Sequence, residues 1–349
     1  MLAFAGTGFG TWAADSWPWP KDRYCWGAWE RDSGPDFLGD AAFGDGDDGS
    51  RSGTESLPTH ERPSGSCEVT IASNYKSSYD GDKVSISQRV SVTYGPVPTA
   101  AEARLSMIQD DYLGADMVAL PDGLPGTVNA RGGLLVLPKS CDAKDGRPTV
   151  VTMQAYGTYA SGPSYTQEDP ADLGGAQQAA VLLVAAANRG MAAAGCAPDK
   201  PLKVSSPVYD LPGRRERVFT SSDDLCGIRG LRFDTEDLYH QTGVVTRDLQ
   251  TCSVAGDRDG IPAVDLAMVA QPRLAAVFDS LTGNRPAVRG WRGTGTLGEN
   301  HSIVRADCAG RPATFLMGAS TDPGHLAAFA NAVAARLGCA PIAPKRAAR

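Results

Sequence analysis

Apolar and polar residues recur in patterns that divide the chain into two halves with the same order of elements. In the first half, residues 84–94 alternate as a half-buried strand does, and residues 100–112 place apolar side chains at helical spacing. Residues 133–137 and 149–156 are typical of strands, and the Ala-rich segment 173–194 is typical of a helix.

The second half has the same kinds of element. Residues 264–270, 302–305 and 314–317 are typical of strands, and residues 273–281 and 326–337 are typical of helices. Short strands with a few helices, and without strict alternation of strand and helix, favour an antiparallel sheet covered by helices. The pattern therefore predicts an α+β fold in each half.

A repeated motif closes each half. It consists of a Cys, the tripeptide Gly-Arg-Pro, an apolar strand, a helix and the tetrapeptide Gly-Cys-Ala-Pro. Two further cysteines precede the motif each time. The eight cysteines then correspond in order, as Cys25, Cys67, Cys141 and Cys196 in the first half and Cys226, Cys252, Cys308 and Cys339 in the second. The repeat predicts two related tandem domains.

The lengths of the closing strand and helix predict which cysteines pair. The strand after Cys141 covers about ten residues, roughly 33 Å, and the following helix of about 22 residues is also roughly 33 Å long. The chain thus returns to its starting end, which places Cys196 beside Cys141. In the second half about 8 strand residues make roughly 27 Å and about 16 helical residues roughly 24 Å, so Cys339 returns to Cys308.

By elimination, the other predicted bridges are Cys25–Cys67 and Cys226–Cys252. Four cysteines in one domain allow three connectivities, so this pairing is a choice among them. A zinc site has little support, because the chain has no CxxC motif and no His pair at ligand spacing. Disulfides persist in oxidising compartments, so the cysteines predict an extracytoplasmic protein.

The same features predict the limits of the domains. Residues 21–200 are expected to form the first Cys-paired domain and residues 223–342 the second, joined by a Pro-containing, charged linker at 201–222. Residues 39–66, rich in Gly, Asp and Ser, are expected to be a flexible insertion. Residues 343–349 are expected to be a disordered tail.

Residues 1–20 are expected to be the end of a membrane anchor or signal segment. Residues 1–14 carry no charge, and Trp17 and Trp19 follow, as aromatic residues do where a helix leaves the bilayer. A spanning helix needs about 20 apolar residues and a signal peptide begins with basic ones, so the hypothesis places the true start upstream. Anchored and released forms both stay open, because Ala3-Phe4-Ala5 could be a cleavage site.

Composition excludes one class of partner. The chain has 349 residues, 42% hydrophobic and 21% charged, with a formal net charge of −7, which fits a folded protein. Nucleic-acid binding depends on a surplus of Lys and Arg that neutralises phosphates, so we expect no nucleic-acid partner.

Two short motifs resemble catalytic or cofactor signatures without their context. Residues 293–298 match GxGxxG, but the following residues lead into a strand and not into the helix that binds pyrophosphate, so a hairpin loop is expected. Ser73 and Lys76 match SxxK, but Ser73 follows a strand-like segment, and the SDN and KTG partner motifs are absent from the sequence.

Calcium and histidine chemistry also lack a signature. The acidic loops at 45–49 and 257–260 fail the EF-hand spacing, because neither has the required Glu at its twelfth position; in the first loop Ser56 stands there. The histidines, His60, His240, His301 and His325, are isolated in the sequence. We therefore assign no catalytic, cofactor-binding or metal-binding residue, and no cofactor.

With its cysteine framework, its Gly-Cys-Ala-Pro helix ends and its Ala-, Gly- and Arg-rich composition, the chain resembles cell-envelope proteins of unknown function from Streptomyces-like actinobacteria. Such actinobacterial proteins typically have an N-terminal membrane segment followed by tandem Cys-paired extracellular domains. The resemblance implies an extracytoplasmic protein, anchored through its N-terminus or secreted. It brings no catalytic residues, and the chain lacks the lipidated Cys of the lipoprotein members.

The leading functional hypothesis is a non-enzymatic envelope module that binds a protein, a peptide or a cell-wall component. The face between the two domains is the expected place for such a site, because clefts between domains commonly bind ligands. The alternative is a secreted hydrolase with an unrecognised Ser, His and Asp site. A third reading is a spacer that stiffens an envelope complex without any pocket.

Overall fold

The structure is a computed structural model, and it describes most of the two predicted domains. The residues described are 23–30, 49–76, 83–161, 165–169, 171–211, 224–229, 231–233, 239–255, 262–318 and 322–344. The predicted N-terminal segment at 1–20 and the acidic loop at 257–260 lie outside the described residues.

The first half forms an antiparallel sheet in which seven strands follow the order β3-β4-β5-β9-β8-β7-β6 and β10 pairs with β9. A short hairpin, β1 (Arg23–Tyr24) and β2 (Trp29–Glu30), precedes it. The strands are β3 (Ser50–Ser56), β4 (Gly65–Lys76), β5 (Lys83–Pro96), β6 (Val118–Ala119), β7 (Gly126–Asn129), β8 (Gly132–Val136), β9 (Thr149–Ser161) and β10 (Tyr165–Asp169).

Two helical segments pack on this sheet from opposite sides. The long helix α2 (Gly175–Ala194) covers one face, where its Ala and Leu side chains meet the apolar positions of β4, β5 and β9. Its end is set by Gly195, whose φ of 73° is a left-handed conformation that glycine adopts without strain. On the other face lies a shorter segment, α1 (Ala101–Leu105), which continues as the π-helical turn η3 (Ser106–Asp110). A short turn, η4 (Lys139–Cys141), follows β8.

The second half forms a sheet of six antiparallel strands in the order β11-β12-β13-β16-β15-β14. The strands are β11 (Tyr239–Val245), β12 (Leu249–Ala255), β13 (Pro262–Val269), β14 (Thr294–Leu297), β15 (His301–Cys308) and β16 (Arg311–Gly318). The helical segments are η5 (Leu225–Gly227), α3 (Pro272–Ala275), η6 (Ala276–Phe278) and α4 (Pro323–Arg336). The α+β class and the two antiparallel sheets that were predicted are therefore confirmed.

The two sheets share one topology, as the predicted repeat would require. Strands β4, β5, β9, β8 and β7 are neighbours in that order, and β12, β13, β16, β15 and β14 repeat it. In each half the short helical segment follows the second of these strands and the long helix follows the third along the path. The duplication is thus visible in the strand order as well as in the cysteines.

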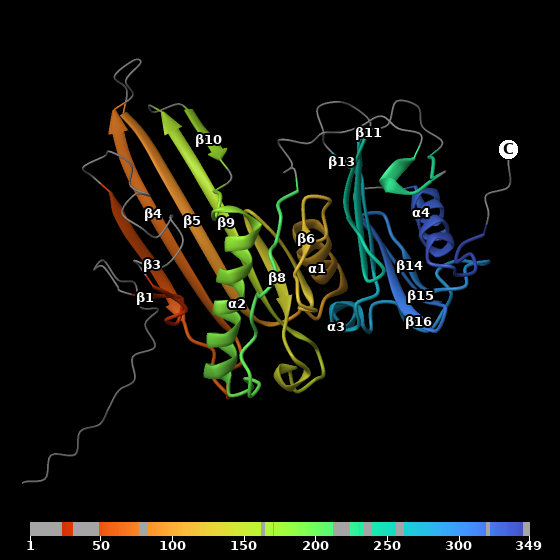
Figure 1. Ribbon diagram of the computed structural model, residues 1–349, viewed down its shortest axis with the longest axis horizontal. Coiled ribbons are helices and arrows are strands. Elements are labelled where there is room, and N and C mark those ends of the chain that lie inside the picture. The colour runs from red at the N-terminus through yellow and green to blue at the C-terminus, as the bar shows by residue number, and fades with distance from the viewer. Residues whose placement is uncertain are drawn as a thin grey trace, which may run out of the picture.

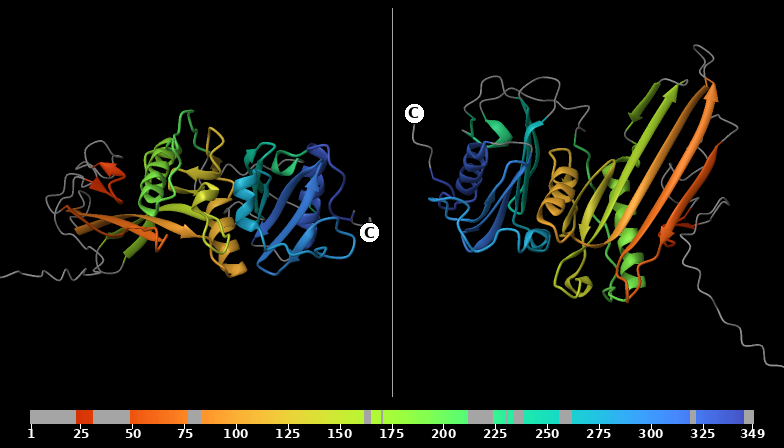
Figure 2. Two further views of the ribbon diagram at one scale, coloured as in Figure 1. Left: turned by 90° about the horizontal axis from the view of Figure 1, so that it is seen from below. Right: turned by 180° about the vertical axis from the view of Figure 1, so that it is seen from behind.

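The face between the two halves is filled by a third buried core. Short segments from both halves, α1–η3 and α3–η6, lie between the two sheets (Figures 1 and 2). Ile108 and Leu113 from the first half pack in one cluster with Phe278 and Leu316 from the second. The face between the domains, where a binding site was expected, is thus occupied by apolar side chains from both halves among the described residues.

One segment predicted to be flexible is ordered. Residues 50–56 form the edge strand β3, which pairs with β4 over seven positions. Alternate side chains explain this order: Glu55 accepts a hydrogen bond from the backbone N–H of Trp26 at 3.1 Å, and the Arg51 guanidinium lies 5.8 Å from the centre of the Tyr24 ring. The Gly and Ser content of the segment hid an alternation that fits a strand.

The chain after α2 runs back along that helix. Asn188 pairs through its amide with the backbone of Leu202, and the Asp210 carboxylate accepts the N–H of Ala176 at the start of the helix. Leu202 and Val208 pack against the first core. Residues 199–211, the beginning of the predicted linker, thus lie against the first half; the domain limits themselves stay predictions.

Candidate functional site

All eight cysteines are paired as predicted. The bridges are Cys25–Cys67, Cys141–Cys196, Cys226–Cys252 and Cys308–Cys339, with Cα–Cα distances of 5.2, 5.1, 5.3 and 5.2 Å. The corresponding bridge occurs in each half, so the duplication extends to the connectivity. Four disulfides indicate an oxidising, extracytoplasmic location.

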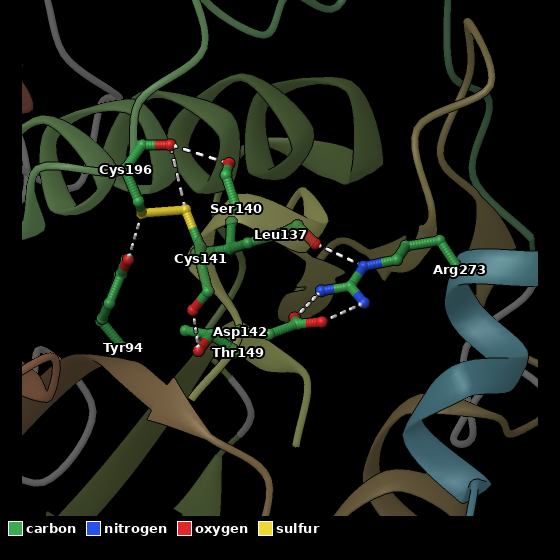
Figure 3. The surroundings of a disulfide bond; sticks show 8 residues. All are labelled: Tyr94, Leu137, Ser140, Cys141, Asp142, Thr149, Cys196 and Arg273. Carbon is green, nitrogen blue, oxygen red and sulfur yellow. Dashed lines mark hydrogen bonds and ion pairs between the residues drawn. A yellow bond between two sulfur atoms is a disulfide. The ribbon is translucent and has the colours of Figure 1, made fainter. Parts of the chain in front are cut away.

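The bridge Cys141–Cys196 joins η4, the short turn between β8 and β9, to the end of α2 (Figure 3). The phenol of Tyr94 lies 3.3 Å from the Cys196 sulfur, and the Thr149 hydroxyl donates to the Cys141 carbonyl at 2.6 Å. Burial raises the pKa of Tyr94 to about 12, so its hydroxyl keeps its proton at neutral pH and acts as a donor. These contacts are structural, because they hold the chain around the bridge and leave no reactive thiol.

Arg273 from the second half closes this region from the other side (Figure 3). Its Nε donates to the carbonyl of Leu137 at 2.6 Å, and its two terminal nitrogens bind both carboxylate oxygens of Asp142. This bidentate pair is only slightly exposed. It ties the segment just after Cys141 to α3, and therefore links the two halves.

The described contacts of two histidines, His301 and His240, are with carboxylates or with the core. Both ring nitrogens of His301 face carboxylates, with Nδ1 at 3.0 Å from Glu102 and Nε2 at 3.1 Å from Asp110. His240 lies in β11, and burial lowers its pKa. Ser73, the Ser of the SxxK match, is buried within β4 and not at the start of a helix. The GxGxxG match forms β14 and its turn into β15, which confirms the predicted hairpin.

No metal site was found in the part of the chain that the structure describes. Within it, no three His, Cys, Asp or Glu side chains gather closely enough to hold a metal ion. A small pocket of about 90 Å³ lies beside Cys308 between Arg247 and Arg311. It is well below the roughly 300–1,000 Å³ of ordinary ligand pockets. None of the described helices combines the length and apolar character needed to cross a bilayer.

The first sheet presents a hydrophilic surface on the side away from α2. We call this surface the polar face and define it by sixteen positions that pair across four strands in four rows. The rows are Ser56-Ser66-Thr93-Thr152, Thr54-Glu68-Ser91-Gln154, Ser52-Thr70-Arg89-Tyr156 and Ser50-Ala72-Ser87-Thr158.

The polar face follows from strict alternation along the strands. Val69, Val90 and Val92 turn toward α2 and are fully buried in the first core, so the residues between them must point the other way. Helix α1 and η3 cover the sheet only near the start of β9, where Thr152 is buried. Among the described residues, no helix or strand lies over the remainder of the polar face, as Figure 2 shows from below.

Hydrogen bonds join side chains of the polar face, both across neighbouring strands and along β9. The hydroxyls of Ser56 and Ser66 are 3.1 Å apart, and the Ser91 hydroxyl donates to the Glu68 carboxylate at 3.4 Å. The phenol of Tyr156 donates to the Gln154 carbonyl oxygen. Burial and then the charge of nearby Asp111 raise the pKa of Tyr156, so the phenol remains a donor at neutral pH.

The polar face had a signal in the sequence that was not used. Residues 84–94 were predicted as a half-buried strand, but the Ser, Thr and Arg residues of its polar side were not treated as a site. The strands beside it have the same alternation, and only the register brings their hydroxyls into rows.

Comparisons with protein-family models, with curated proteins and with solved structures found no match.

Proposed function

We propose that this protein is a non-enzymatic, extracytoplasmic envelope module that binds a component of the cell wall through the polar face. The observation that carries the proposal is a difference between two related sheets. In the second half, the face that corresponds to the polar face is buried: Leu249, Val269 and Leu316 lie in the core between the halves, and Thr251, Ser253 and Asp265 beside them are also buried. In the first half, this face gives Leu134 and Val150 to the same core at one end and carries exposed or half-buried hydroxyls along most of its length.

The two copies of this face are therefore used differently. The buried copy packs the two halves together, while the polar face extends beyond the packed region on the long strands β4, β5 and β9 (Figure 1). A spacer would need only a solvated surface. On the polar face, hydrogen bonds between side chains of neighbouring strands also restrict the positions of the groups that a ligand would meet. Such pre-ordered groups favour binding, because less side-chain entropy is lost when a ligand arrives.

The wall is the partner class that fits the location. Four disulfides support an extracytoplasmic location, where a chain can meet envelope polymers, and an acidic chain with net charge −7 is unsuited to nucleic acid. The rival hydrolase has less support from the described residues, because His301 is held between Glu102 and Asp110 and not beside a serine.

Co-sedimentation with purified, insoluble bacterial cell walls tests the proposal. The oxidised full chain is expected to sediment with the walls. A variant with Thr54→Lys and Thr158→Lys is expected to lose most of this binding, because two long charged side chains would stand on the exposed outer strands of the polar face. Val181→Lys with Ala192→Lys is the matched control, since both residues are exposed on α2 at the opposite side of the sheet.

The proposal would be supported if the control double variant on α2 still binds the walls and the polar-face double variant does not. Equal binding by all three proteins would show that another surface binds the wall. Failure of the unmodified chain to sediment would overturn the proposed function. Thermal unfolding of each variant shows whether lost binding comes from lost fold.

A further inference from the structure

The ligand class can be argued from the chemistry of the polar face. Eleven of its sixteen positions are Ser or Thr, and two others are Gln154 and Tyr156. A hydroxyl both donates and accepts hydrogen bonds, and so does a side-chain amide. The surface therefore matches a ligand whose own groups are donors and acceptors at once.

The charges on the polar face cancel. Glu68 and Arg89 are its charged residues, and they lie 3.6 Å apart as an ion pair on neighbouring strands. The whole chain has a net charge of −7, so the polar face is close to neutral within an acidic molecule. An anionic polymer meets no cationic surplus among the sixteen positions, and the one further charge that acts on Tyr156, Asp111, is also negative.

An aromatic ring lies in the third row. Tyr156 is 51% exposed and stands opposite Arg89, while its hydroxyl is fixed by Gln154. A phenol ring combines an apolar face with a polar tip, so it can pack on the C–H face of a sugar ring while the tip remains hydrogen-bonded. The hydroxyls around it lie on a grid of about 4.8 Å across the strands and about 6.7 Å along them.

We propose that the polar face binds a neutral, hydroxyl-rich glycan chain, which packs on Tyr156 and exchanges hydrogen bonds with the Ser and Thr rows. This inference rests on the proposed function and names its ligand class. A protein partner fits less well, because the cores of protein interfaces are enriched in aromatic residues, Met and Arg and are depleted of Ser.

A glycan array that carries neutral and anionic oligosaccharides tests the ligand class, followed by titration with chitohexaose, an uncharged hexamer of N-acetylglucosamine, and with any stronger neutral glycan. Tyr156→Ala is expected to weaken binding to the neutral glycan by about tenfold or more, because a central aromatic contact dominates many interfaces. Tyr156→Phe keeps the ring and should retain most of the affinity. Since no net charge is involved, binding is expected to change little between low and high salt.

Tyr209→Ala is the matched control, because Tyr209 is 77% exposed and outside the polar face. Binding of neutral glycans that Tyr156→Ala weakens and Tyr209→Ala does not would support the inference. Binding confined to anionic glycans, or no glycan binding by a chain that still sediments with walls, would overturn the ligand class and leave the proposed function standing. A chain that binds neither walls nor glycans would overturn both.

Discussion

Two cysteines, Cys25 and Cys226, adopt the same unusual backbone conformation in the two halves. Cys25 and Cys226 both have a positive φ, 50° and 58°, which is uncommon for a residue with a side chain. Each lies in a tight turn with a left-handed glycine close behind, Gly27 and Gly227. The bridge in each half therefore begins from the same strained turn, and the cysteine is kept there by its covalent partner on the neighbouring strand.

His240 differs from these cysteines, because it is a buried residue that belongs to the second half alone. It is 5% exposed in β11, and its Nδ1 has no hydrogen-bond partner in the described part of the chain. Burial lowers the pKa of His240 in the folded state. The unfolded chain then binds a proton near the ordinary pKa of about 6.5 while the folded chain does not.

Stability is therefore expected to fall as the pH is lowered from 7 through about 6.5 toward the depressed pKa of the folded state. The slope contributed by this one proton is at most about 1.4 kcal/mol per pH unit. His240→Leu should flatten that dependence, because it removes the titrating group. The control His60→Leu, at an exposed position, should leave it unchanged. Urea unfolding at pH 7, 6 and 5 measures the effect, and equal pH dependence in all three proteins would contradict the assignment.

Each long helix is tied to the chain that follows it by one partly buried amide. Asn188 in α2 donates to the carbonyl of Leu202 and accepts its N–H, both at 2.9 Å. Asn331 in α4 accepts the N–H groups of Ile342 and Ala343 and donates to the carbonyl of Ala343. Both residues stand eight positions before the closing cysteine of their motif. The repeat therefore includes an Asn that the sequence analysis overlooked.

Asn188→Ala and Asn331→Ala are each expected to lower the free energy of unfolding by about 1–3 kcal/mol, because backbone groups that they satisfy would lose their partners. The neighbouring exposed residue provides a control: Arg189→Ala should change stability by about 0.5 kcal/mol or less. Urea titrations of the three oxidised variants give these values. Similar losses for Arg189 and Asn188 would show that the amide has no special role.

Most elements could be predicted because their patterns are local. The helices expected at 173–194 and 326–337 occur at Gly175–Ala194 and Pro323–Arg336, since Ala-rich sequence and a closing glycine act within one segment. The helices expected at 100–112 and 273–281 are shorter and partly irregular, as α1–η3 and α3–η6. Their side chains pack between the halves, and the distant half decides where their regular turns end.

The whole molecule is held by contacts between its halves as well as within them. Arg104 from α1 donates to the carbonyls of Val277 and Asp279, and Arg273 from α3 binds Leu137 and Asp142 in return. Each half thus inserts an arginine into the other beside the shared apolar core. The two sheets are expected to unfold together.

Arg273→Ala is expected to lower stability by about 2–3 kcal/mol, because it leaves the slightly exposed Asp142 carboxylate without its bidentate partner. Arg311 offers a control, since it pairs with Asp248 where both side chains are 51% exposed, and Arg311→Ala should cost about 1 kcal/mol or less. Thermal unfolding followed by near-ultraviolet circular dichroism reports the change. A second, separate transition in the Arg273 variant would measure how far the halves had been uncoupled, and equal effects of the two variants would contradict the buried link.

The sequence by itself determined the cysteine pairing, the duplication and the main elements, because these depend on spacing along the chain and on the lengths of a strand and a helix. The tertiary structure alone decided which surfaces stay open. An alternating pattern predicts that a strand has two faces, but which face is buried depends on the distant segments that pack on it. Here those segments fill the space between the halves and leave the hydroxyl rows of the first sheet facing outward.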